Sequence, residues 1–153
     1  MSRRILVPLV AFALLSGLAL VAPAFADEAA APTRNAVEGV WVTGDGEGWV
    51  EIARQGDSLV GTILGGPKGD DRLDEHNPDP ALRSRRLTGL RILEGFAPDG
   101  PGKWVDGTIY DPNNGKTYGC TLELEGEDTL KVRGYLGVSL FGRTEKWTRK
   151  PGS

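Results

Sequence analysis

Apolar and polar residues alternate over short stretches along most of this chain, which is the pattern of β-strands with one buried face. The alternation is clearest in 116–124, where Tyr118, Cys120, Leu122 and Leu124 share one face. The other face of that stretch carries small or polar residues. No stretch beyond the N-terminal segment repeats apolar residues at the spacing of an amphipathic helix, so the pattern predicts an all-β fold.

Residues that favour turns, mainly Gly, Pro, Asn and Asp, divide this pattern into eight predicted strands. The predicted ranges are 39–43, 49–54, 58–64, 87–96, 103–110, 116–124, 129–135 and 141–149. Nearly all the connections are short, so we expect neighbouring strands to run antiparallel. The strongest turn, 111–115, combines proline with Asn-Gly, a pair that tolerates positive φ.

An eight-stranded antiparallel up-and-down barrel accounts for this arrangement of strands. A closed barrel leaves no sheet edge exposed, and with eight strands its interior holds side chains or one small ligand. Two stacked sheets are the alternative architecture. In both cases the apolar strand faces form the core, and the polar faces meet solvent.

The N-terminal segment has the three regions of an export signal. Arg3 and Arg4 form the positive region, 5–21 is almost wholly apolar, and Ala-Phe-Ala at 24–26 suits signal peptidase. We therefore expect cleavage after Ala26, which makes the protein periplasmic or secreted. A retained membrane anchor is the alternative, and after cleavage no membrane span is expected.

Signal cleavage divides the chain of 153 residues into three parts. Residues 1–26 are the signal peptide, 27–37 form a flexible leader rich in alanine, and 38–150 form the β-barrel domain. This length suits a single folded domain. All the candidate binding residues discussed below belong to the barrel domain.

The composition narrows the chemistry that this domain can perform. One cysteine and one histidine exclude an internal disulfide framework and a zinc site with several Cys or His ligands. The formal net charge of -3, with both signs interspersed, argues against the basic face that nucleic acid needs. No triad, paired-carboxylate motif or phosphate-binding loop is visible, so we expect no enzyme activity, catalytic residue, metal or cofactor. His76 should be an exposed loop residue and Cys120 a small core residue.

The long connection between the third and fourth predicted strands is rich in charged residues, and such loops are commonly functional or disordered. Asp79-Pro80 predicts a short helical turn through Arg83, which would act as a lid over the barrel mouth. We expect the acids and bases of this loop to pair with one another. The alternatives are calcium binding by Asp71, Asp74 and Asp79, or arginine recognition of an anionic ligand. The residues singled out in this lid loop are Asp74, Asn77, Asp79 and Arg83.

Charged residues follow the period-two spacing of the last predicted strand. The residues on one of its faces are Phe141, Arg143, Glu145, Trp147 and Arg149. If that face is inward, Arg143 and Glu145 are buried charges that must pair with each other, with a tyrosine or with a ligand. A bulge near Gly142 would instead expose Arg143. The candidate ligand-binding residues are Arg143, Glu145, Tyr118, Tyr135, Tyr110 and Trp104.

The two ends of the predicted barrel resemble those of the lipocalin and fatty-acid-binding group of barrels. Gly39-Val40-Trp41 opens the first strand, and Trp147-Thr148-Arg149 closes the last. In that group a Gly-x-Trp packs under a C-terminal arginine and seals one end of the barrel, and a guanidinium can stack on an indole. The resemblance implies a structural closing role, and the residues concerned are Gly39, Trp41, Trp147 and Arg149.

A second resemblance covers almost all of the chain after the signal peptide. Its motif segments occur in family order at 39–43, 77–83, 107–112, 130–135, 139–144 and 147–149. They make the chain similar to the bacterial exported family called domain of unknown function 2147. This resemblance implies a lipocalin-like barrel in the envelope and brings no established catalytic residues. Members often carry a cysteine pair around the second-to-third hairpin, and 54–60 lacks one here.

These expectations favour a periplasmic protein that binds a small hydrophobic or amphipathic ligand inside its barrel. Arg143 would hold an anionic head group, and aromatic residues would hold the apolar part of the ligand. The alternative is a non-enzymatic structural or interaction protein of the envelope that acts through its surface and acidic loop. The sequence names no protein partner.

Overall fold

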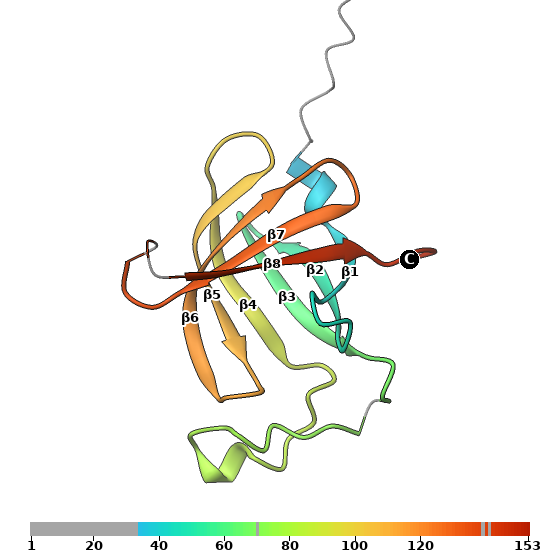
Figure 1. Cartoon of the computed structure of the whole chain (residues 1–153), viewed down its shortest axis with the longest axis vertical. Coiled ribbons are helices and arrows are strands. Elements are labelled where there is room, and N and C mark those ends of the chain that lie inside the picture. The colour runs from blue at the N-terminus through green and yellow to red at the C-terminus, as the bar shows by residue number, and fades with distance from the viewer. Residues whose placement is uncertain (1–33, 70, 139, 141) are drawn as a thin grey trace, which may run out of the picture.

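The structure, a computed structural model, describes residues 34–69, 71–138, 140 and 142–153 (Figure 1). The predicted signal peptide and most of the predicted leader lie outside the described residues. The strands are β1 (Gly39–Val42), β2 (Trp49–Gln55), β3 (Ser58–Gly65), β4 (Arg91–Pro98), β5 (Lys103–Asp111), β6 (Lys116–Leu124), β7 (Thr129–Tyr135) and β8 (Gly142–Arg149). The short 3-10 helices are η1 (Arg34–Val37) and η2 (Pro80–Leu82).

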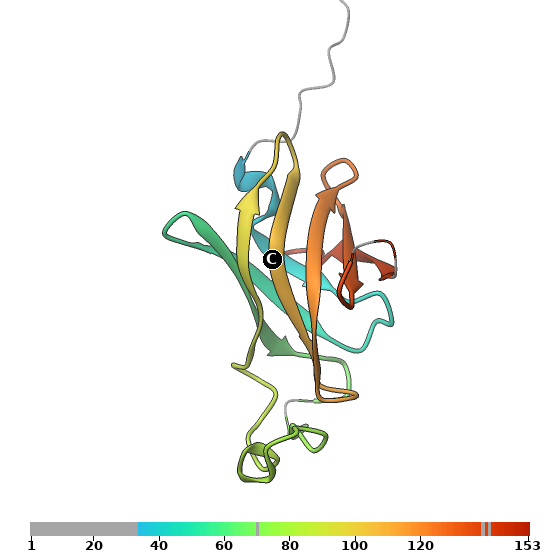
Figure 2. The ribbon, with the colours of Figure 1, turned by 90° about the vertical axis from the view of Figure 1, so that its left-hand side faces the viewer.

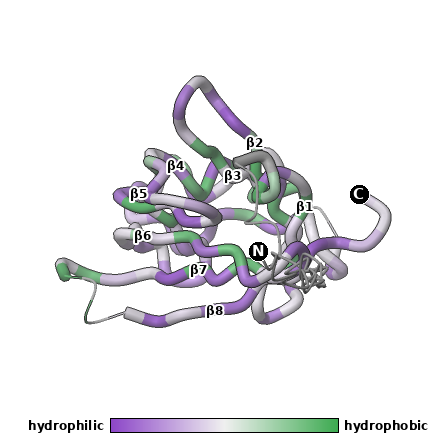
Figure 3. The backbone as a smooth tube through the Cα atoms, turned by 90° about the horizontal axis from the view of Figure 1, so that it is seen from above, coloured by the Kyte–Doolittle hydropathy of each residue, from purple (hydrophilic) through white to green (hydrophobic). Residues whose placement is uncertain are grey.

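Each strand pairs antiparallel with the next, and β8 pairs with β1 through Trp41↔Arg149 and Val42↔Thr148. The strands therefore form a closed barrel, and from above they follow one another around a ring (Figure 3). This confirms the predicted eight-stranded up-and-down barrel, and the alternative of two stacked sheets is wrong. Helix η1 and the connection between β3 and β4 lie at opposite ends of the barrel (Figure 2). Within the described part of the chain, the helices are too short or too polar to cross a membrane.

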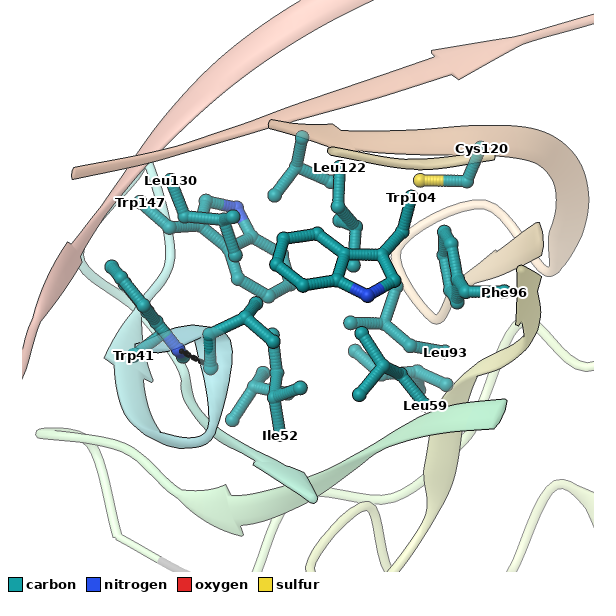
Figure 4. Close-up of a cluster of buried hydrophobic side chains, with 14 of the residues drawn as sticks. Trp41, Ile52, Leu59, Leu93, Phe96, Trp104, Cys120, Leu122, Leu130 and Trp147 are labelled. Atoms are coloured by element: carbon teal, nitrogen blue, oxygen red, sulfur yellow. Dashed lines mark hydrogen bonds between the residues drawn. The ribbon is translucent and has the colours of Figure 1, made fainter. Parts of the chain in front are cut away.

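The core fills the end of the barrel that lies next to η1, and every strand contributes a side chain to it (Figure 4). Its bulk comes from three indole rings and one phenyl ring, each at most 2% exposed. These large core residues are Trp41, Phe96, Trp104 and Trp147. Gly107 makes room for one of them, because a β-carbon at this position would lie 2.3 Å from the Phe96 ring. The inward faces of the strands are therefore the apolar faces that the alternation predicted.

The closed end of the barrel is sealed by the contact that the lipocalin resemblance implied. The Arg149 guanidinium lies over the Trp41 ring, 4.3 Å from its centroid, and donates to the carbonyl oxygen of Glu38 at 3.1 Å. Gly39 has φ of 127°, and a β-carbon there would lie 2.8 Å from Arg149 Nη1. The indole Nε1 of Trp41 donates to the carbonyl of Val37 at 2.8 Å, and Val37 is fully buried. The last residues of the predicted flexible leader, Arg34–Val37, thus belong to the fold as η1.

The start of β4 differs from the predicted one. Apolar residues from Leu87 onward predicted a strand there, but β4 begins at Arg91. The amide of Leu90 donates to the carbonyl of Leu87 across a turn in which Gly89 has φ of 84°. Leu87 is nevertheless buried, and its amide donates to the carbonyl of Arg72. Its apolar character therefore reflects the packing of a loop against the barrel.

Cys120 on β6 is fully buried, as predicted, and burial raises the pKa of its thiol to about 12. Because the thiolate is the reactive form, we expect iodoacetamide at neutral pH to alkylate folded Cys120 more than about 1,000-fold more slowly than an exposed thiol. Intact-mass spectrometry follows the reaction, and unfolding in urea should restore labelling. A cysteine introduced at the neighbouring outward position in Cys120→Ser/Thr121→Cys is the matched control. Fast labelling of folded wild-type protein would contradict the burial of this side chain.

Candidate functional site

A cavity of about 820 Å³ opens at the end of the barrel opposite η1. This volume lies within the range of small-molecule binding pockets, roughly 300–1,000 Å³. Its rim is formed by the β1–β2 turn, the β5–β6 turn and the beginning of β8. Its apolar wall residues are Val50, Ile63, Ile92, Ile109 and Val132, with Trp147 nearest the packed core. The barrel is therefore filled at one end and hollow at the other.

The inward face of β8 has two charged residues, Arg143 and Glu145, between the rim of this cavity and the core. The register between β7 and β8 is continuous, with Gly134↔Arg143, Val132↔Glu145 and Leu130↔Trp147, so the predicted alternative of a bulge near Gly142 is wrong. Arg143 lies nearest the rim, Glu145 lies deeper, and Trp147 reaches the core. Because β8 begins at the open end, the Arg143 side chain is 87% exposed and that of Glu145 39%. The face is inward, but this placement does not bury the two charges, and Arg143 is exposed without a bulge.

Glu145 contacts both Arg143 and Trp147, but each of these contacts is long. Arg143 Nε lies 3.6 Å from Glu145 Oε1, and the indole Nε1 of Trp147 donates to Glu145 Oε2 at 3.5 Å. Hydrogen bonds between charged groups are normally about 2.7–2.9 Å long. Both oxygens of Glu145 thus have room for a shorter contact with a bound molecule.

The structure brings most of the predicted ligand-binding residues to the cavity. Those that line it are Arg143, Glu145, Tyr110, Tyr118 and Tyr135. The hydroxyl of Tyr118 accepts a hydrogen bond from Asn114 Nδ2 at 3.0 Å. The Tyr135 ring lies against Gly119 on the outer face of the sheet, so it borders the mouth from outside. Trp104 belongs to the packed core instead, and its Nε1 finds no hydrogen-bond partner among the described residues.

The connection between β3 and β4, here the β3–β4 loop, is fastened to the barrel by a buried carboxylate. Asp74 is fully buried and accepts hydrogen bonds from Tyr110 Oη at 2.6 Å and Asn77 Nδ2 at 2.7 Å. Arg85 donates to the same carboxylate through Nε at 2.8 Å and lies 5.9 Å from the centroid of the Tyr110 ring. The carboxylate therefore joins two parts of the loop to strand β5.

The environment of Asp74 favours its charged form. Burial by itself raises the pKa of the Asp74 carboxyl, but the hydrogen bonds from Tyr110, Asn77 and Arg85 outweigh it and hold the pKa below its usual value. Burial and the negative charge of Asp74 together raise the pKa of the Tyr110 hydroxyl. Tyr110 thus stays a hydrogen-bond donor at neutral pH and serves the loop, although sequence analysis had assigned it to a ligand.

Some of the remaining charges of the β3–β4 loop stay within it, as expected, whereas Lys68 and Arg72 contact Glu47 of the β1–β2 turn. Asp79 caps η2 by accepting from the amide of Ala81 at 2.9 Å, which confirms the predicted turn. Arg83 Nε donates to the carbonyl of Asn77 at 2.8 Å, and Asp71 pairs with Arg86. Over the described residues, no three His, Cys, Asp or Glu side chains gather as metal ligands. The exposed turn η2 lies beyond the open end of the barrel (Figure 2).

Two features of this region escaped sequence analysis. Arg85 was not singled out among the basic residues of the loop, although it contacts the buried carboxylate of Asp74. The cavity wall was not predicted either, because it combines inward residues from several strands and two loop residues, Arg72 and Leu87. The spacing of polar residues gave no signal for either, since the partners of Asp74 include Tyr110 on a different hairpin.

Comparisons with known proteins identify a family and a similar fold. A family model described as "Uncharacterized protein conserved in bacteria (DUF2147)" matches residues 39–149. Among solved structures, the chain is similar to protein HP1028 from Helicobacter pylori, which is described as belonging to the lipocalin family. The TM-score is 0.68 at 22% sequence identity, over 75% of this chain and 83% of the other. No curated protein matches the chain. At this identity the structural likeness establishes the lipocalin-like fold alone.

Proposed function

The chain belongs to the DUF2147 family of uncharacterised bacterial proteins, and we propose its function from its own cavity. We infer that it is an exported, non-catalytic protein that binds a small hydrophobic or amphipathic molecule inside the barrel. The observation that carries this proposal is the open cavity of about 820 Å³ with apolar walls. The lipocalin-like fold of the chain is compatible with it.

The distribution of residues in the cavity matches an amphipathic ligand. The apolar part of a ligand would be buried against Ile63, Ile109 and Val132. This burial favours binding by about 25 cal/mol for each Å² of apolar surface removed from water. Arg143 and Glu145 at the open end offer charge to a polar head group. A ligand would thus place its apolar part toward Trp147 and its head group toward solvent.

A role through the acidic loop alone receives less support. Asp74 is buried against Arg85, and Asp71 pairs with Arg86. These acids are therefore engaged within the loop itself, whereas the cavity walls have apolar surface available to a ligand.

Narrowing the cavity tests the proposal directly. Ile109 lines the cavity, and the adjacent Thr108 on β5 points outward and is exposed. We expect Ile109→Trp, alone or combined with Val132→Trp, to weaken binding of the neutral fluorescent probe N-phenylnaphthylamine at least tenfold, because the indole occupies its space. Thr108→Trp adds the same group outside the barrel and should leave binding unchanged. Equal binding by all these variants, with folding verified by circular dichroism, would contradict a ligand site in the barrel.

Protein purified from its own host tests the natural ligand and export together. Native mass spectrometry should show an additional bound mass that is lost on denaturation. The denatured chain should have the mass of a protein that begins at Asp27, as signal cleavage requires. A chain that keeps residues 1–26 would contradict the proposed export, and an empty wild-type barrel from the host would contradict ligand carriage.

A further inference from the structure

The charged residues around the cavity differ in what they are free to bind. Seven charged residues in the described part of the chain line it, and five of these have structural partners. Asp45 accepts from Thr43 and from the amide of Glu47, which holds the β1–β2 turn. Glu47 pairs with Lys68, and its carbonyl accepts a hydrogen bond from Arg72. The charged groups of Asp45, Glu47 and Arg72 are therefore engaged in the structure of the rim.

The β5–β6 turn and the outer face of β8 account for two more charges. Asp111 accepts hydrogen bonds from the amide of Asn113 and from Asn114 Nδ2, so it fixes its own turn. Lys146 pairs with Glu125 at 2.8 Å, which draws its ammonium away from the cavity. The two charges that remain are those of Arg143 and Glu145, on the inward face of β8.

Arg143 and Glu145 form a pair of opposite charges with a fixed order along the cavity. Glu145 lies on the side of Trp147 and the core, and Arg143 lies on the side of the solvent. Their closest contact of 3.6 Å is longer than a strong charge-assisted hydrogen bond. Each group can therefore turn toward a ligand charge without losing a close partner.

We propose that this cavity selects a zwitterionic amphiphile whose protonated amine lies on the tail side of its anionic group. The amine donates to Glu145, the anion accepts from Arg143, and the tail lies along the apolar walls. The order follows from β8, because the group nearer the core meets the part of the head that is nearer the tail. This inference rests on the proposed binding of an amphiphile in the barrel.

A ligand with a single charge fits this pair less well. An anionic head held by Arg143 lies near the like charge of Glu145, and a cationic head held by Glu145 lies near Arg143. Repulsion between like charges is one way in which binding sites reject a wrong partner. A zwitterion in the opposite order meets like charge at both positions, so its affinity should be lower still.

Four amphiphiles with the same tail length test this order. N-dodecylglycine carries its ammonium next to the tail and its carboxylate beyond it, whereas dodecylphosphocholine carries the phosphate next to the tail. Dodecanoate and dodecylamine each carry one charge. In displacement of N-phenylnaphthylamine below micelle concentrations, we expect N-dodecylglycine to bind roughly tenfold more tightly than dodecylphosphocholine, as one gained charge-assisted hydrogen bond allows. The two compounds with a single charge should fall between them.

Exchanging the two charges is the decisive variant. Arg143→Glu/Glu145→Arg reverses the order along β8, so it should come to prefer dodecylphosphocholine over N-dodecylglycine. The ion pair between Arg91 and Glu94, two exposed residues of β4, supplies the matched control, because Arg91→Glu/Glu94→Arg should keep the wild-type preference. Circular dichroism and binding of the neutral probe verify that each variant retains its fold and its cavity.

The outcomes separate this inference from the function on which it rests. Tight binding of the neutral probe, with no difference among the four amphiphiles or an unchanged preference after the charge exchange, overturns the head-group order and leaves the binding function standing. Failure of the wild-type protein to bind the probe or any amphiphile overturns both. The proposed order is supported if the preference reverses in Arg143→Glu/Glu145→Arg and does not reverse in the control variant.

Discussion

Replacing Asp74 with alanine should lower the free energy of unfolding by about 3 kcal/mol, the cost of removing a buried charged acceptor of several hydrogen bonds. The loss is large because the fully buried carboxylate accepts hydrogen bonds from Tyr110, Asn77 and Arg85. Alanine removes the acceptor of Tyr110 Oη and leaves Asn77 Nδ2 only its 3.2 Å hydrogen bond to Tyr110, and the guanidinium of Arg85 loses its counter-charge. Urea unfolding, followed by tryptophan fluorescence, measures the change.

The exposed carboxylate of Asp71 provides the matched control for this substitution. It lies in the same loop and also pairs with an arginine, Arg86, but its side chain is 91% exposed. Because exposed ion pairs contribute little, Asp71→Ala should unfold at the same urea concentration as the wild-type protein. Trypsin gives a second measure, since Asp74→Ala should release the loop and speed cleavage after Arg83, Arg85 and Arg86. Equal stability of the two variants would show that the buried carboxylate does not fasten the loop.

The contribution of Asp74 should depend on pH in a defined direction. The pKa of its carboxyl is lowered in the folded protein, because the three hydrogen bonds outweigh the opposing effect of burial. Folding is therefore linked to deprotonation, and the stabilisation is fully present above the unfolded-state pKa, about 3.9. It is lost as the pH falls through the lower folded-state pKa. The difference between wild-type protein and Asp74→Ala should hold constant down to about pH 5 and shrink below about pH 4.

The barrel could be predicted from the sequence because its signals are local and repeated. Tyr118, Cys120 and Leu122 alternate with polar residues within one strand, and the closed barrel places them on the inward face. The Gly39 and Trp41 motif also has a direct physical meaning, since the glycine leaves space for the Arg149 guanidinium. Such features depend on the sequence pattern and on a few close contacts, so they can be recognised without knowledge of the tertiary structure.

The candidate site could be predicted only in part, because its geometry depends on contacts between distant segments. Arg143 and Glu145 were found by period-two spacing, but their exposure depends on where the barrel is open. The role of Asp74 depends on Tyr110, which lies 36 residues away in the chain. Leu87 resembled the start of a strand, because an apolar residue that packs from a loop gives the same local signal. Burial and the hollow end of the barrel are properties of the assembled sheet.

Arg149→Ala should also destabilise the barrel by about 3 kcal/mol, because this guanidinium joins segments that are far apart in the sequence at the closed end of the barrel. Its Nη1 and Nη2 donate to the carbonyls of Glu38 and Ala36, and Nε donates to the carbonyl of Glu127 at 2.9 Å. The same group stacks on Trp41 at 4.3 Å from the ring centroid. Alanine removes these contacts and leaves carbonyl groups without their charged donor.

The conservative variant distinguishes the shape of this group from its charge. Lysine keeps the positive charge but lacks the planar fork that reaches several carbonyls at once, so Arg149→Lys should recover only a small part of the stability. Lys150→Ala is the neighbouring control, since Lys150 lies over the ring of Trp49 at 5.1 Å and should contribute little. Urea unfolding with tryptophan fluorescence compares the four proteins. Wild-type stability in Arg149→Lys would show that charge alone seals the barrel, and wild-type stability in Arg149→Ala would show that the seal is not needed.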